Sequence, residues 1–208
     1  MSNLDFNQLP TLPVASTRLD QQKFERIFNE CLNLKDFKNQ RFSTNLSGHG
    51  SVQHYRLREN QNILCAEVQG MAEAYDKMYD IRSRNQFFIE NKFEFDGSDL
   101  WVNYQKKGDH LTLHTHEGLL SWVLWVKIPY EIKDELKTGP ESSTSCFVFN
   151  YNDFDGRQRT SKVSVSKKDQ GILMMFPSQL QHIVYPFYTS EEERISISGN
   201  IRYKNMIQ

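Results

Sequence analysis

Three of the six histidines in this 208-residue chain lie within seven residues, at His110, His114 and His116. If this segment is a β-strand, side chains two apart share a face, so all three imidazoles point the same way. Imidazoles on one face can chelate one metal ion, and they suit iron(II), zinc, copper and nickel alike. The alternative is a solvent-facing strand that carries histidines by chance. A fourth histidine, His182, favours the metal site, because it follows the apolar run 171–177 and starts a strand that can return beside the first pair.

Arg194, twelve residues after His182, begins a segment in which polar and apolar residues alternate. On a strand this alternation places three polar side chains on one face: Arg194, Ser196 and Ser198. A guanidinium fork matches the two oxygens of a carboxylate, and a neighbouring hydroxyl adds a third donor. The segment therefore predicts a carboxylate clamp made by Arg194 and Ser196. The alternative is a solvated arginine that pairs with the acidic residues at 191–193.

The order of these residues resembles the iron(II)- and 2-oxoglutarate-dependent oxygenases, in particular their small prolyl-hydroxylase-like bacterial and phage members. Tyr104 lies ten residues before His114, and the distal His182 and the Arg194-x-Ser196 strand follow in the same order as in that family. The resemblance runs from about residue 85 to 203 and is carried by four stretches, at 101–104, 108–116, 176–182 and 194–198.

The resemblance implies that His114 and His182 are iron ligands and that Arg194 binds the distal carboxylate of 2-oxoglutarate, with help from Ser196 and Tyr104. It implies oxidative decarboxylation of 2-oxoglutarate with O2 to succinate and carbon dioxide, coupled to hydroxylation of a protein, a peptide or a small molecule. Ascorbate is expected to stimulate such an enzyme. Two alternatives stay open: a cupin-like metalloprotein with another metal or reaction, and a jelly-roll binding module without enzymatic activity.

One position departs from the family pattern. His116 stands where most members carry the aspartate or glutamate that completes a two-histidine, one-carboxylate site. His116 itself is the first candidate for the third ligand. Glu117 is an alternative, although a regular strand would point it to the opposite face. His110 or Asp109 could substitute, or the site could hold no iron at all.

The elements that would position these residues divide the chain into a helical first part, 1–84, and a β-rich part, 85–208, within one structural domain. Helices are expected after a cap at Ser16 or Thr17 and from about Asn60, each with an apolar stripe at helical spacing. Short strands are expected near 87–95, 100–106, 110–116, 120–128, 146–150, 161–166, 172–176, 182–187 and 194–203. This pattern predicts a double-stranded β-helix, a jelly-roll core, with the helices packed against one sheet.

Composition and charge argue against nucleic acids and membranes as partners of this chain. The chain has 25 Lys and Arg against 26 Asp and Glu, a net charge of −1, so it lacks the basic excess typical of nucleic-acid binding. The apolar run 119–128 is too short to cross a bilayer, and the N-terminus has no signal-peptide pattern, which favours a cytoplasmic protein. The three cysteines share no metal or disulfide spacing and are expected to be small buried hydrophobic residues: Cys31, Cys65 and Cys146.

Overall fold

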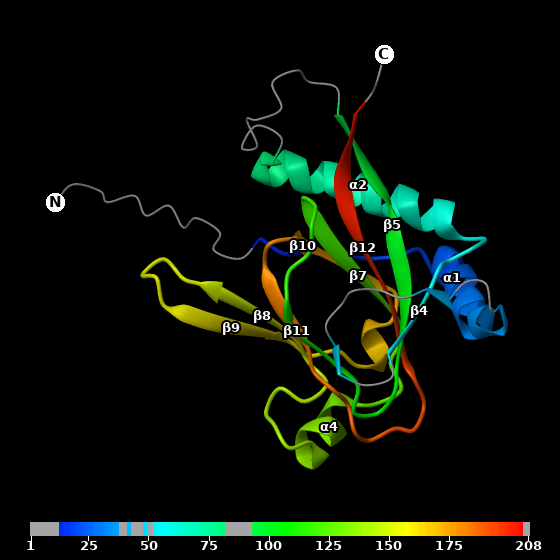
Figure 1. The fold of residues 1–208 in the computed structure, drawn as a ribbon, viewed down its shortest axis with the longest axis vertical. Coiled ribbons are helices and arrows are strands. Elements are labelled where there is room, and N and C mark those ends of the chain that lie inside the picture. The colour runs from blue at the N-terminus through cyan, green and yellow to red at the C-terminus, as the bar shows by residue number, and fades with distance from the viewer. Residues whose placement is uncertain (1–12, 38–40, 43–47, 50–51, 82–92, 206–208) are drawn as a thin grey trace.

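Two antiparallel sheets build the core of the molecule (Figure 1). The computed structural model describes residues 13–37, 41–42, 48–49, 52–81 and 93–205. The seven-stranded sheet has the order β1 (Ala15–Arg18), β10 (Ile172–Pro177), β7 (Leu120–Lys127), β12 (Arg194–Asn205), β5 (Phe93–Gln105), β4 (Gln53–Tyr55) and β2 (Arg41–Phe42). The five-stranded sheet has the order β3 (Gly48–His49), β6 (His110–His114), β11 (Gln181–Val184), β8 (Phe147–Asn152) and β9 (Gln158–Val163). This arrangement is the predicted jelly-roll core.

The outer face of the seven-stranded sheet is sealed by two helices, α1 (Gln21–Asn33) and α2 (Gln61–Tyr79), and Figure 1 shows α2 lying across β5. Helix α1 begins at Asp20, whose carboxylate accepts hydrogen bonds from the first backbone N–H groups of the helix. Buried residues of both helices join the apolar side chains of the sheet in one cluster, which contains Ile27, Cys31, Leu64, Val68, Leu124 and Ile197. The helices therefore fix the back of the sheet whose front carries the site.

Strict alternation along β7 and β12 separates the two faces of this sheet. On β7, Trp122 and Leu124 belong to the outer cluster, whereas Val123 and Trp125 belong to a second cluster between the sheets. On β12, Ile195 and Ile197 face the helices. The predicted alternation from residue 194 is thus confirmed, and it turns Arg194 towards the interior of the jelly roll.

Several expectations about elements are wrong, each for a local reason. Ser16 and Thr17 do not cap a helix, because they form β1 at the edge of the sheet. The expected turn at 96–98 is a bulge inside the single strand β5, where Gly97 leaves room for Val68 of α2. A short helix, α4 (Ile132–Thr138), was not expected. Residues 87–92, where the sequence predicts the first part of a strand, lie outside the described part of the chain. Within the described residues, no helix is long and apolar enough to cross a bilayer.

Candidate metal and anion site

Three histidines meet where β6 and β11 pair in the five-stranded sheet. His114 lies opposite His182 in the register, and their ring centroids are 4.2 Å apart. His116, just beyond the end of β6, lies 4.9 Å from His114 and 5.1 Å from His182, again between centroids. One nitrogen of each ring falls within 4.8 Å of the others. The structure therefore brings together the three predicted metal ligands.

The protonation of these rings suits a metal. His114 Nδ1 lies 2.6 Å from the backbone oxygen of Thr112, and His182 Nδ1 lies 2.8 Å from that of Leu180. Since a carbonyl only accepts, each Nδ1 carries the proton and each Nε2 keeps its lone pair for a ligand. Burial lowers the pKa of His114, lowers that of His116 to about 4 and lowers that of His182 to about 3. All three imidazoles are neutral near pH 7, as metal ligation requires, so the donor set fits a metal ion.

His110 does not join the group, because the period of two breaks along β6. The register shifts between the pairs His182–His114 and Val184–Leu111, so three residues of β6 span two residues of β11. This bulge turns both Leu111 and His114 to the inner side although they are an odd number of residues apart. The expectation that His110 shares the face of the other two is therefore wrong.

The other two candidate ligands also lie elsewhere. Glu117 is exposed and is not part of the histidine group. Asp109 is buried, and its carboxylate accepts a hydrogen bond from the backbone N–H of Lys106 in the turn between β5 and β6. Neither carboxylate is brought to the three histidines, which leaves His116 as the third ligand that the geometry offers.

Neighbouring groups hold the histidine rings in place. The Phe147 ring stacks on His182 with centroids 5.1 Å apart and planes 13° apart, and Trp101 lies 5.9 Å from His116. The backbone of His116 is tied to the turn after β10, because its N–H donates to Ser178 and its carbonyl accepts from the Gln179 side chain. Ligand position is therefore set by contacts outside the group itself.

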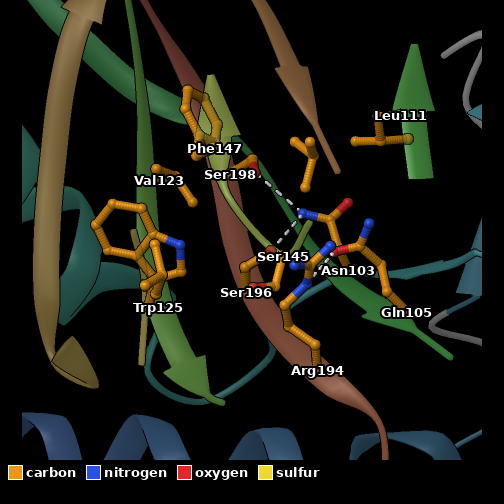
Figure 2. A pocket seen from close by; sticks show the side chains of 12 residues that line it. Asn103, Gln105, Leu111, Val123, Trp125, Ser145, Phe147, Arg194, Ser196 and Ser198 are labelled. Atoms are coloured by element: carbon orange, nitrogen blue, oxygen red, sulfur yellow. Dashed lines mark hydrogen bonds between the residues drawn. The ribbon is translucent and has the colours of Figure 1, made fainter. Parts of the chain in front are cut away.

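A cavity between the two sheets adjoins this group (Figure 2). Phe147 lines it and also stacks on His182, so the cavity and the histidine group share a wall. Its volume is about 30 Å³, which is room for only about one or two water molecules. The lining combines an apolar side with a polar one: Leu111, Val123, Trp125, Phe147, Val165 and Val184, and Asn103, Gln105, Ser145, Arg194, Ser196 and Ser198.

Arg194 is the only cation among the described residues that line this cavity, and it is 4% exposed. Its guanidinium donates to three oxygens at 3.0 Å: Gln105 Oε1, the Tyr130 hydroxyl and the Tyr185 backbone oxygen. All three acceptors are neutral, and no carboxylate among the described residues forms an ion pair with Arg194. An uncompensated buried charge is expensive, and an anionic ligand would compensate it.

Asn103 connects the cavity to a histidine that the sequence analysis did not single out. The Asn103 amide nitrogen donates to Ser198 at 3.0 Å and to Ser196 at 3.3 Å (Figure 2). Its Oδ1 lies 3.0 Å from Nδ1 of His54, which is buried and opposite Asn103 in the β4–β5 register. These contacts fix which end of the amide faces the serines.

Tyr104 does not line this cavity. It points to the outer face of β5, where its hydroxyl donates to the backbone oxygen of Cys31 in α1 at 2.6 Å. The physical reason is strand parity, because Asn103 and Gln105 occupy the inner face on either side of it. A different tyrosine, Tyr130, bonds to Arg194. Tyr130 lies in a loop, where no periodic pattern announces a buried side chain.

Comparison with known proteins agrees with this geometry. Residues 99–200 match the family model described as "Putative 2OG-Fe(II) oxygenase". No curated protein matches the sequence.

Solved structures share the fold at low identity. A prolyl-4-hydroxylase from Pseudomonas putida superposes with a TM-score of 0.62 at 15% identity, over 94% of this chain and 95% of that one. The carbocyclase SnoK of nogalamycin biosynthesis gives 0.60 at 11% identity, over 93% and 79%. HygX from Streptomyces hygroscopicus, solved with nickel and 2-oxoglutarate bound, gives 0.56 at 10% identity, over 95% and 84%.

Proposed function

We propose that this chain, whose residues 99–200 match the 2OG-Fe(II) oxygenase family model, is an iron(II)- and 2-oxoglutarate-dependent hydroxylase that uses His114, His116 and His182 as its metal ligands. One observation carries the proposal. Three neutral imidazoles converge beside a cavity in which a buried arginine has no carboxylate partner among the described residues. A metal ion fits the three imidazoles, and an anionic co-substrate fits the buried arginine.

The three histidines would hold the iron through Nε2. The hydrogen bonds from Nδ1 of His114 and His182 to backbone oxygens fix the tautomer and the ring orientation. When bound, iron(II) supplies the redox chemistry that couples oxidative decarboxylation of 2-oxoglutarate with O2 to hydroxylation of the substrate. With three neutral ligands the ion keeps its full double charge, which favours an anionic co-substrate over a neutral one.

Arg194 would bind the distal carboxylate of 2-oxoglutarate. Its planar fork matches two carboxylate oxygens, and burial makes this pairing stronger than it would be in water. Ser196 lines the same cavity, and Asn103 presents its amide to Ser196. Because the cavity volume is only about 30 Å³, binding requires lining side chains to rotate. The Gln105 amide is suited to this movement, since its oxygen can release Arg194 as the carboxylate arrives.

The apolar side of the cavity would keep water from the reacting groups. Trp125, Val123 and Phe147 are each less than a tenth exposed and belong to the cluster between the sheets. A dry wall strengthens electrostatic binding of the co-substrate and limits unproductive oxidation.

Formation of succinate from 2-oxoglutarate, in the presence of iron(II) and ascorbate, tests the function. We expect turnover in the wild-type protein, slow without a primary substrate, and none in His182→Ala. Calorimetry of 2-oxoglutarate binding to the anaerobic iron(II) protein provides a second measurement. Absence of both turnover and binding in the wild type would contradict the proposal.

For the substrate, we propose a side chain of a protein or peptide, or a small molecule with a similar group. The fold similarity to a prolyl-4-hydroxylase makes prolyl peptides the first class to assay. Stimulation of succinate formation by such peptides, with a mass increase of one oxygen in the peptide, would support this class. Stimulation only by free amino acids or other small molecules would exclude prolyl peptides as the substrate class.

A further inference from the structure

Ser145 has an unusual backbone conformation beside the cavity. It precedes β8, is 1% exposed and has a φ of +61°. A positive φ is unfavourable for a residue with a Cβ and is normally left to glycine. Within the described residues, the one other non-glycine with positive φ is Asp80, which ends helix α2 as a left-handed cap. Ser145 is instead the third residue of a β-turn, which the Cys146 N–H closes by donating to the backbone oxygen of Ser143 at 3.0 Å.

The network that holds Arg194 also holds this conformation. The Ser145 N–H donates to the backbone oxygen of Pro186 at 2.8 Å. Its carbonyl accepts a hydrogen bond from the Tyr130 hydroxyl at 3.2 Å, and that hydroxyl in turn accepts from Arg194. Both backbone groups of Ser145 are thus hydrogen-bonded. Its carbonyl is linked to the Arg194 guanidinium through the Tyr130 hydroxyl.

The Ser145 side chain is left without a partner. Its Oγ is buried, has no hydrogen-bond partner among the described residues and belongs to the cavity lining shown in Figure 2. The amide nitrogen of Gln105, on the same lining, is buried and unpartnered too. Most buried polar groups in proteins are hydrogen-bonded, and each exception calls for an explanation. Two unpartnered donors lining one cavity with an uncompensated arginine point to a ligand rich in acceptors.

We propose that Ser145 is a binding residue for the co-substrate, and that its hydroxyl donates a hydrogen bond to the distal carboxylate held by Arg194. This inference rests on the proposed function, since it takes 2-oxoglutarate as the ligand. The β-turn at 143–146 places this buried, unpartnered hydroxyl in the cavity lining, at a turn position that favours glycine. A carboxylate offers acceptors for both the hydroxyl and the Gln105 amide beside the guanidinium fork.

Two substitutions separate binding from folding. Ser145→Ala removes the hydroxyl and keeps the Cβ, whereas Ser145→Gly also relieves the positive φ. Ser143→Ala is the matched control, because Ser143 lies on the same segment and does not line the cavity. The probes are 2-oxoglutarate and 2-oxobutyrate, a 2-oxo acid without the distal carboxylate, titrated calorimetrically into the anaerobic iron(II) protein. Thermal unfolding is measured on each variant.

We expect both Ser145 variants to bind 2-oxoglutarate about tenfold more weakly, the loss typical of one hydrogen bond to a charged group. The Kd for 2-oxobutyrate should stay within twofold of the wild-type value. The Tm of Ser145→Gly should equal or exceed that of the wild-type protein. A Kd for 2-oxoglutarate that is unchanged in both variants overturns the inference, as does an equal loss for both probes together with a lower Tm. If the wild-type protein binds neither probe, the proposed function itself is wrong. This result differs from the results that contradict only the role of Ser145.

Discussion

The two faces of the seven-stranded sheet are made by alternate residues of the same strands, yet they differ in the polar groups that they bury. On the outer face, apolar side chains pack against α1 and α2, and the polar tip of Tyr104 reaches a backbone oxygen. On the inner face, and within the described part of the chain, Arg194 forms no ion pair and the Gln105 amide nitrogen has no hydrogen-bond partner. The outer face therefore mainly stabilises the fold, whereas the inner face keeps an arginine and an amide available for ligands.

The strongest test of the outer face is Leu124→Ala. Leu124 is completely buried against the helices, so the cavity created should lower the free energy of unfolding by about 2–5 kcal/mol. Its neighbour Val123 lines the inner cavity, and Val123→Ala should lower stability by only about 1.5 kcal/mol, because fewer groups leave the core. Urea denaturation of both variants measures the difference. Equal losses would show that the inner face contributes to stability as much as the outer face.

The histidine group gives the largest expected effect on ligand binding. His182→Ala removes one of three ligands, so affinity for iron(II) or for cobalt(II) as its substitute should fall at least about 100-fold. His110→Ala is the matched control, because the bulge in β6 turns His110 away from the group. Metal titration followed by elemental analysis measures both variants. If His110→Ala weakened binding as much as His182→Ala, the assignment of three ligands would be wrong.

Arg194→Lys tests whether the fork of the guanidinium matters or only its charge. A lysine cannot bind two carboxylate oxygens in parallel, so affinity for 2-oxoglutarate should fall about 10- to 100-fold while metal affinity is unchanged. Arg202→Lys is the control on the same strand, since Arg202 is exposed and bonds Asp99. Calorimetry with 2-oxoglutarate compares the two. An unaltered Kd in Arg194→Lys would remove the arginine from the co-substrate site.

The regular parts of the site were predictable from sequence because strand parity is a local rule. The alternation from Arg194 to Ser198 identified the inward residues of β12 correctly, and the spacing of His114, His116 and His182 identified the group that converges. The same parity would have excluded Tyr104, which follows the inward Asn103 directly. The prediction instead followed the family pattern, in which a tyrosine lies ten residues before the first histidine ligand.

The irregular parts were beyond any periodic pattern. The bulge that separates His110 from His114 depends on the register between β6 and β11, which forms only when distant segments pair. Tyr130 and Ser145 reach Arg194 or its cavity from loops, where side-chain direction follows from individual backbone angles and tertiary hydrogen bonds.

Tyr104→Phe should have the smallest effect of these substitutions, and it tests most directly whether the two faces of β5 are separate. The change removes one hydrogen bond, from the Tyr104 hydroxyl to Cys31 in α1, so unfolding should become easier by about 0.5–1.5 kcal/mol. The Kd for 2-oxoglutarate should stay within twofold, because the hydroxyl lies on the outer face. Tyr130→Phe is the counterpart, since its hydroxyl bonds both Arg194 and the Ser145 backbone, and it should weaken 2-oxoglutarate binding. If Tyr104→Phe instead raised the Kd about tenfold with no change in stability, the hydroxyl would have to reach the inner cavity. The separation of the two faces at β5 would then be wrong.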